Sequence, residues 1–159
     1  MKRMGMAMVL LLVASSAIAA ENFALHRPVT GSPICKPGEE AIKAVDGRLS
    51  SKTEHKFCTL EKPAWLQIDL QARRQVRELV VKHAGAGGEA VAMNTRAYTL
   101  ALSEDGRQWR QVVSVRDNRD SVRRHAIAPT WARYVRLEVR EPAQDPADPA
   151  TRIYEVEVR

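Results

Sequence analysis

The residues best suited to bind a metal ion are two carboxylates near opposite ends of the chain. Asp46 precedes Gly47 in a segment, residues 43–51, that is too irregular for a helix or strand, and a tight turn there directs backbone carbonyls toward the carboxylate. Calcium takes about six to eight oxygen ligands at flexible angles, so one loop rarely supplies them all. Glu155, in the strand-like segment 152–158, is the candidate second carboxylate. The alternative is a solvated Asp-Gly turn, a common signal in loops, with Glu155 as an exposed strand residue.

The two cysteines, Cys35 and Cys58, predict a disulfide, because an even number of cysteines in an oxidising compartment usually forms disulfide bonds. Closing a loop of this length stabilises a fold by roughly 3 kcal/mol in the chain-entropy model. The bond would also fix the Asp46 loop, which lies between the two cysteines. A metal site made of two cysteines alone is less expected, because structural zinc sites use four ligands.

The first residues have the pattern of a secretory signal peptide. Lys2 and Arg3 give a basic start, residues 9–13 an apolar run, and residues 17–19 a small-residue cleavage pattern. We therefore expect residues 1–20 to be removed and the product to be exported, to the periplasm or out of the cell. No later apolar run has the length of a transmembrane helix.

The charge of the chain gives no indication of nucleic-acid binding. Its formal net charge is +6, and without Lys2 and Arg3 it falls to about +4, a mild excess. The arginines are spread over alternating positions, as in Arg133, Arg136 and Arg140, which is typical of solvated strand faces. Nucleic-acid binding would need a clustered basic patch and a recognisable motif, and neither is present in the sequence.

Alternation of apolar and polar residues predicts a series of short strands. These lie at residues 65–70, 76–83, 98–102, 109–115, 122–127, 132–140 and 153–158. Glu104, Asp105 and Gly106 predict a hairpin turn, and residues 39–45 one or two helical turns. Short strands, frequent turns and a distant closing strand, with no long helix and no repeat, favour an all-β fold, an antiparallel sandwich.

Six short motifs follow one another along the chain: Asn22-Phe23-Ala24, Ala44-Val45-Asp46-Gly47, Trp65-Leu66-Gln67-Ile68-Asp69-Leu70, Tyr98 through Ser103-Glu104-Asp105-Gly106 with Trp109, Arg133-Tyr134-Val135-Arg136-Leu137 and Ile153-Tyr154-Glu155-Val156-Glu157-Val158. In this order they resemble one known family, the coagulation-factor (F5/8) type C or discoidin domain of the galactose-binding-like superfamily. The resemblance covers nearly all of residues 21–159. It implies an eight-stranded antiparallel jelly-roll β-sandwich with neighbouring termini. Bacterial relatives of this kind are often carbohydrate-binding modules of family 32.

The resemblance also implies a structural calcium ion, because many such modules hold one opposite the ligand face. Carried over residue by residue, the ligands are three backbone carbonyls, two carboxylates and a serine. They are Lys43, Arg48 and Tyr154 for the carbonyls, Asp46 and Glu155 for the carboxylates, and Ser51. Such an ion would stabilise the fold and order the loop, and would take no part in chemistry.

The predicted ligand site lies in two loops whose sequences resemble bacterial discoidin domains attached to glycoside hydrolases. Its residues are His83, Glu89, Asn94 and Arg96. Their side chains can exchange hydrogen bonds with sugar hydroxyl groups, and the glycines between them let backbone approach a ligand closely. The alternative is structural: Arg96 and Glu89 pair to hold a long loop, and His83 packs beside them.

Aromatic side chains are the second requirement of a sugar site, because a pyranose ring has an apolar face. The three tryptophans, Trp65, Trp109 and Trp131, are predicted to be core residues of the strands and so are poor candidates. Phe57 stands where relatives often carry a tryptophan, which would weaken stacking, and His55 is close to it in sequence. We include both in the predicted ligand site.

No arrangement of residues predicts catalysis. A glycosidase needs two facing carboxylates on rigid positions, whereas the acidic residues here fall in turns, proline-rich loops or exposed strand positions. The sequence has no serine nucleophile elbow and no zinc-type histidine spacing. We therefore expect a monomeric, non-catalytic module that binds a carbohydrate. The alternative is a protein or peptide partner in the cell envelope or a secreted complex, and a membrane surface ranks lower because the loops are polar or glycine-rich.

Overall fold

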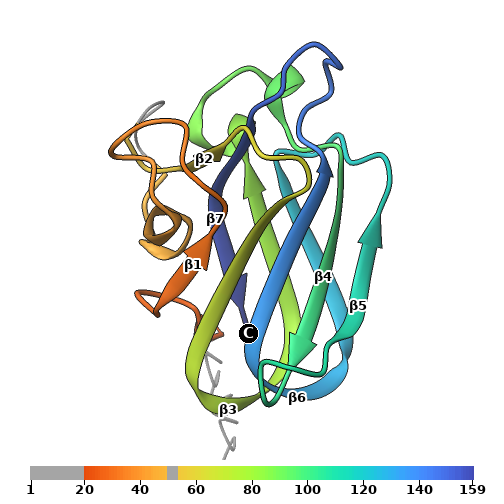
Figure 1. Ribbon diagram of the computed structural model, residues 1–159. Helices are drawn as coiled ribbons and strands as arrows, with labels where there is room; N and C mark the ends of the chain where they lie inside the picture. The colour runs from red at the N-terminus through yellow and green to blue at the C-terminus, as the bar shows by residue number, and fades with distance from the viewer. Residues whose placement is uncertain (1–19, 50–53) are drawn as a thin grey trace, which may run out of the picture.

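The structure is a computed structural model that describes residues 20–49 and 54–159 as a sandwich of β-strands (Figure 1). The strands are β1 (Val29–Gly31), β2 (Phe57–Thr59), β3 (Ala64–His83), β4 (Ala97–Ser103), β5 (Arg110–Val115), β6 (Val122–Glu141) and β7 (Thr151–Val158). Three short 3₁₀ helices are η1 (Ala41–Val45), η2 (Ala84–Gly87) and η3 (Val91–Met93). The predicted signal peptide, except its last residue, and Ser51 lie outside the described residues.

The described part of the chain confirms the all-β prediction and corrects the strand count to seven instead of eight. The segments predicted as separate strands at 65–70 and 76–83 are two halves of β3, which is 20 residues long. The register of β3 against β6 shifts between Asp69 and Arg74, and Gln71 has a φ of 61° there. Such a bulge bends a strand without ending it, so the chain passes from one layer to the other without a loop. The 20-residue β6 does the same.

All strand pairs are antiparallel, and the two long strands contribute to both layers. One layer combines β1, the first half of β3, the second half of β6, β4 and β5. The other combines β2, β7, the second half of β3 and the first half of β6. Alternation along β3 turns Leu66, Ile68 and Leu70 into the core, where they are buried. Trp65 and Gln67 therefore face outward.

The prediction that the three tryptophans are core residues is wrong. Trp65 is 38% exposed and Trp131 46% exposed, while Trp109 is half-buried. Trp65 alternates with the buried Leu66 and so must point away from the core. Trp131 lies where β6 bends, and the Arg73 guanidinium stacks over its ring at 4.6 Å. The core is built from smaller side chains, and three indole groups remain on the surface.

Two contacts confirm that the ends of the domain lie together, as the resemblance implied. The Phe23 N–H donates to the Val158 carbonyl at 2.7 Å, and the Asn22 side chain accepts from the Val158 N–H at 3.1 Å. The predicted disulfide between Cys35 and Cys58 is also confirmed, with Cα atoms 5.4 Å apart. Among the described residues, no helix has the length and apolar character needed to cross a bilayer.

Candidate functional site

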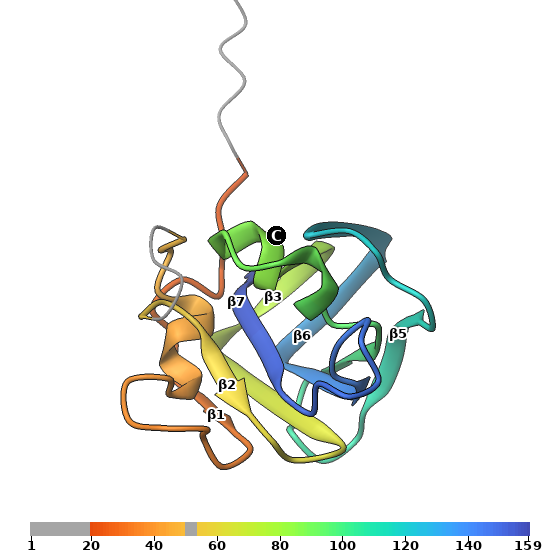
Figure 2. The same cartoon turned by 90° about the horizontal axis from the view of Figure 1, so that it is seen from above.

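The loop that follows β3, residues 84–96, and the loop of residues 142–150 together cover one end of the sandwich (Figures 1 and 2). A hydrogen bond joins the two loops, from the Gln144 N–H to the Ala92 carbonyl at 2.9 Å. Gly87 lies so close to the Tyr154 ring that a Cβ on it would approach the ring to 1.9 Å. Only glycine fits this contact, which presses η2 onto β7.

Asn94 lies inside this loop and is fully buried. Its Oδ1 accepts from the Gly85 N–H at 2.7 Å, and its Nδ2 donates to Ser121 Oγ at 3.2 Å. Its backbone carbonyl accepts from Gln144 Nε2 at 3.1 Å. Asn94 therefore holds three segments together through its side chain and its backbone carbonyl. Its side chain is buried, so a ligand at the surface would not reach it.

Substituting Asn94 separates this structural role from ligand contact. Asn94→Ala removes a fully buried side chain and leaves the partly buried Gly85 N–H without its acceptor, so we expect it to lower the free energy of unfolding by about 2 kcal/mol. Arg96→Ala removes only an exposed side chain, and we expect a change of less than about 0.5 kcal/mol. Urea unfolding monitored by tryptophan fluorescence measures both values. Equal stability of the two variants would contradict the structural role of Asn94.

His83 is also buried, at the end of β3. Its ring lies 5.3 Å from the Tyr98 ring, and neither ring nitrogen has a hydrogen-bond partner among the described residues. The pKa of His83 is lowered to about 3, mainly by burial, with smaller contributions from the charges of His125 and Arg123. His83 is thus a neutral core residue. No local pattern in the sequence predicts that Tyr98, whose hydroxyl is 2.9 Å from His125 Nε2, packs against it.

Glu89 and Arg96 do not pair with each other, so that part of the structural alternative is wrong. Glu89 Oε1 instead accepts from Lys56 Nζ at 2.8 Å and from the Tyr154 hydroxyl at 2.7 Å. Arg96 Nε lies 3.4 Å from Asp117 Oδ1, and both side chains are about half exposed, at 44% and 51%. Glu89 holds the loop to β2 and β7, whereas Arg96 stands at the surface.

The remaining two predicted ligand residues lie apart from Arg96. Phe57 is a core residue, 1% exposed. His55 Nδ1 lies 3.3 Å from Asp46 Oδ2 and so belongs to the Asp46 loop. The structure therefore does not gather the six predicted ligand residues into one cluster, and it leaves Arg96 as the member most accessible to a ligand.

The structure does bring together the two carboxylates predicted to bind calcium. The Gly47 N–H donates to Glu155 Oε2 at 3.0 Å, although the two residues are 108 positions apart. Glu155 is 2% exposed, and its Oε1 has no hydrogen-bond partner among the described residues. Burial raises the pKa of Glu155 to about 8; the Gly47 N–H opposes this, and the Asp46 charge adds to it. A buried carboxylate oxygen without a donor, beside a second carboxylate, fits a bound cation.

A second group of metal-ligating types is explained without a metal. Glu39 lies within reach of the sulfur atoms of Cys35 and Cys58. Because the two sulfurs are bonded to each other, they are not available as thiolate ligands. Glu39 instead lies 3.8 Å from the ammonium of Lys56, with both side chains largely buried.

Comparison with known proteins identifies the family. The sequence profile of the NedA-like, galactose-binding domain family, a group of F5/8 type C domains, matches residues 43–137. The chain belongs to this family. The match spans the Asp46 loop, β3, β4, β5 and the bend of β6, which together form most of the sandwich. The sequence matches none of the curated proteins with which it was compared.

Solved structures of similar fold agree with membership of the NedA-like family. The family 32 carbohydrate-binding module of Streptococcus pneumoniae EndoD has a TM-score of 0.77 and 26% identity, over 87% of this chain and 99% of that module. Chitosan-binding module 1 of a Paenibacillus sp. IK-5 chitosanase/glucanase scores 0.72 with 21% identity, over 88% and 99%. The lectin domain of Lectinolysin, complexed with Lewis b antigen, scores 0.73 with 22% identity, over 89% and 98%. The last two likenesses show the fold alone.

Proposed function

We propose that this protein is an exported, monomeric and non-catalytic carbohydrate-binding module. The observation that carries the proposal is the family match over residues 43–137, supported by the likeness to a family 32 module along 99% of that module's length. The Cys35–Cys58 disulfide supports export, because such bonds persist in oxidising compartments.

We place the sugar at the loop end of the sandwich, with Arg96 as the main contact. Its guanidinium presents several N–H donors in a fixed plane, and Asp117 beside it offers acceptor oxygens. A donor and an acceptor side by side suit neighbouring hydroxyl groups of a sugar ring. His83, Glu89 and Asn94 contribute by holding the loop that carries Arg96, whereas Phe57 and His55 lie on the side of the Asp46 loop.

Binding to short glycans tests this function. The relatives are described with fucose, Lewis b and chitotriose, so these and galactose form the first panel, followed by a glycan array. We expect at least one glycan to bind and Arg96→Ala to weaken that binding tenfold or more, about 1.4 kcal/mol. Arg116→Ala, at another exposed position near this end, should bind as the wild type does. Capture of a single envelope protein, with no glycan bound, would instead support a protein-binding role.

We also propose that a calcium ion joins the Asp46 loop to β7. The carboxylates of Asp46 and Glu155 would bind it with the carbonyls of Lys43, Arg48 and Tyr154, and with Ser51, which lies outside the described residues. The ion would supply charge neutralisation to two close carboxylates, one of them buried. Its role is structural, because the Asp46 loop and β7 come from opposite ends of the sequence.

A further inference from the structure

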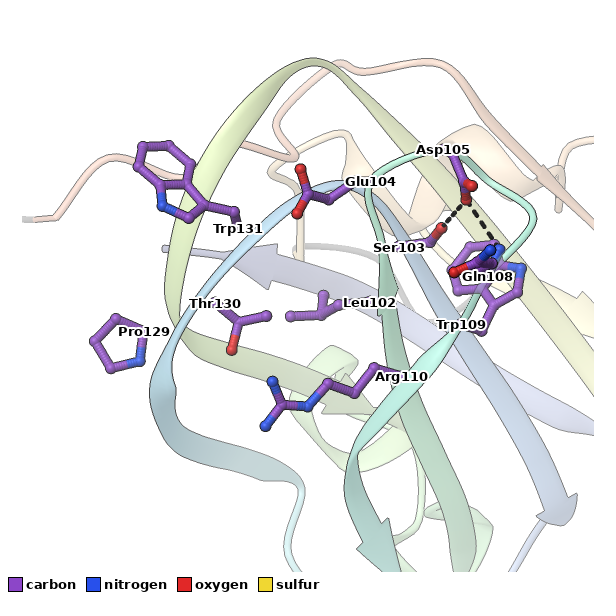
Figure 3. A pocket seen from close by; sticks show the side chains of 10 residues that line it. All are labelled: Leu102, Ser103, Glu104, Asp105, Gln108, Trp109, Arg110, Pro129, Thr130 and Trp131. Carbon is purple, nitrogen blue, oxygen red and sulfur yellow. Dashed lines mark hydrogen bonds between the residues drawn. The ribbon is translucent and has the colours of Figure 1, made fainter.

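A shallow groove crosses the outer face of the layer formed by β3, β6, β4 and β5. Two clefts, of about 310 and 230 Å³, meet at Arg136 and Glu138, which line both of them. Trp65 borders the first cleft and Trp109 the second. A third cleft, of about 530 Å³, also borders Trp109, but it is lined by the core residue Leu102 and its cross-strand partner Arg110, and it extends around the edge of the layer to Trp131. Figure 3 shows this third cleft between the turn that joins β4 to β5 and the bend of β6.

We propose that this groove binds a neutral polysaccharide chain laid across the strands, at a surface separate from the loop end. The inference rests on the proposed carbohydrate-binding function and adds a second site to it. Two indole groups, Trp65 and Trp109, border the groove, and such rings offer apolar area to the C–H faces of sugar rings. Gln67, Arg136 and Glu138 lie between them and can exchange hydrogen bonds with hydroxyl groups.

The polar floor of the groove is held in place before any ligand binds. Arg136 Nη2 donates to Gln67 Oε1 at 2.7 Å, and its guanidinium stacks on the Trp109 ring at 4.4 Å. Arg136 Nε is buried and has no hydrogen-bond partner among the described residues. A fixed guanidinium and a fixed indole lower the conformational entropy that a ligand must remove on binding.

The charges that line the groove are few and nearly balanced, which favours a neutral ligand. Glu138 Oε1 lies 3.3 Å from Arg140 Nε, and Arg136 is the one further charged side chain of the described residues that lines the two clefts. A polyanion would need a cluster of positive charge, and its binding would weaken strongly with added salt. Binding through stacking and hydroxyl contacts would change little with salt.

The dimensions of the groove favour a chain over a single sugar. From β3 to β5 the groove crosses about three strand spacings, roughly 14 Å, which is longer than one sugar ring. Trp65, on β3 and 38% exposed, stands at one end, and the half-buried Trp109, next to β5, stands at the other. A short glycan would contact only part of this length, so we expect measurable affinity for a polymer and weak affinity for monosaccharides.

Affinity electrophoresis in gels that contain polysaccharide tests the inference. The probes are galactomannan and xyloglucan as neutral polymers and polygalacturonate as an anionic polymer, with and without 0.5 M NaCl. We expect at least one neutral polymer to retard the wild type, and Trp65→Ala and Trp109→Ala to lower the affinity tenfold or more. Trp65→Phe should restore much of it, because a ring remains. Leu60→Ala, which removes an exposed apolar side chain elsewhere, should leave it unchanged.

Three outcomes would overturn the proposed role of the groove. In the first, both tryptophan variants are retarded by a neutral polymer as strongly as the wild type. In the second, only polygalacturonate retards the protein and salt abolishes the effect; in the third, no polysaccharide retards it and sedimentation shows a dimer that depends on the tryptophans. Circular dichroism shows whether each variant is folded. If Trp109→Ala does not fold, the result for Trp65→Ala decides the test. If Arg96-dependent binding of short glycans persists in any of these cases, the groove fails and the proposed function stands. If neither short nor long glycans bind, both fail.

Discussion

Lowering the pH from 7 to 4 is expected to remove about 3 kcal/mol from the free energy of unfolding through His83 alone. Burial lowers the pKa of the folded-state His83 from 6.5 to about 3. Between these two values the unfolded chain binds a proton at this histidine and the folded chain does not. The stabilising difference is therefore fully present above pH 6.5 and is lost as the pH falls toward 3.

His83→Leu tests this expectation, since leucine is of similar size and, within residues 20–49 and 54–159, the ring nitrogens have no hydrogen-bond partner that would be lost. We expect the variant to keep its stability at pH 7 and to lose about 3 kcal/mol less than the wild type at pH 4. The matched control is His26→Asn: His26 is exposed and has a φ of 57°, a backbone conformation that asparagine tolerates. Urea unfolding at each pH in the presence of chelator measures these values. Parallel pH profiles for the wild type and His83→Leu would show that His83 is not responsible.

Calcium is expected to stabilise the wild type by about 2.7 kcal/mol when its free concentration is a hundredfold above the dissociation constant. The reason is that the ion would bind the folded state, where Asp46 and Glu155 meet, and not the unfolded chain, where they are far apart. Asp46→Ala should remove most of the response. Glu155→Gln should do so as well, although the two positions are more than a hundred residues apart in sequence.

Glu155→Gln is the more informative variant, because it removes the charge and retains an oxygen that can accept from the Gly47 N–H. In chelator it should be at least as stable as the wild type, since it no longer buries a carboxylate beside Asp46. Glu61→Gln, at an exposed position, is the matched control and should retain the full calcium response. Magnesium should substitute poorly because it demands a tighter octahedral site. Melting temperatures that do not change with calcium or chelator, in protein shown to be metal-free by elemental analysis, would exclude the site.

Contacts between distant segments were predictable from the sequence where few partners were available. The two cysteines could only pair with each other, and Glu155 was predicted to supply the second carboxylate to a cation at the Asp46 turn. The structure confirms the disulfide and places Glu155 against Gly47.

Burial within the loop after β3 was not predictable in the same way. Local sequence suggested only that His83 and Asn94 were polar residues in a glycine-rich loop. Their burial depends on Tyr98, Ser121 and Gln144, which come from three other segments. Conversely, the exposure of Trp65 could have been predicted from the sequence. Leu66, Ile68 and Leu70 alternate with it, and only one of the two faces of the strand could be the core.

A local sequence pattern also does not predict that β3 and β6 are each one continuous strand. A bulge interrupts the alternation of side chains much as a loop does, so the sequence around Gln71 predicted two strands where the structure has one. The distinction depends on pairing with β6 on both sides of the bulge. Fold class and topology were therefore predictable, while the number of strands was not.

Isothermal titration calorimetry with the best glycan of the panel, on the wild type and Arg96→Ala, measures carbohydrate binding itself. We expect saturable binding of one glycan per chain by the wild type, weakened tenfold or more in Arg96→Ala, with the two proteins equally stable to urea. Wild-type protein that is folded and calcium-loaded and yet binds none of the glycans on the panel or the array would contradict the claim that this is a carbohydrate-binding module.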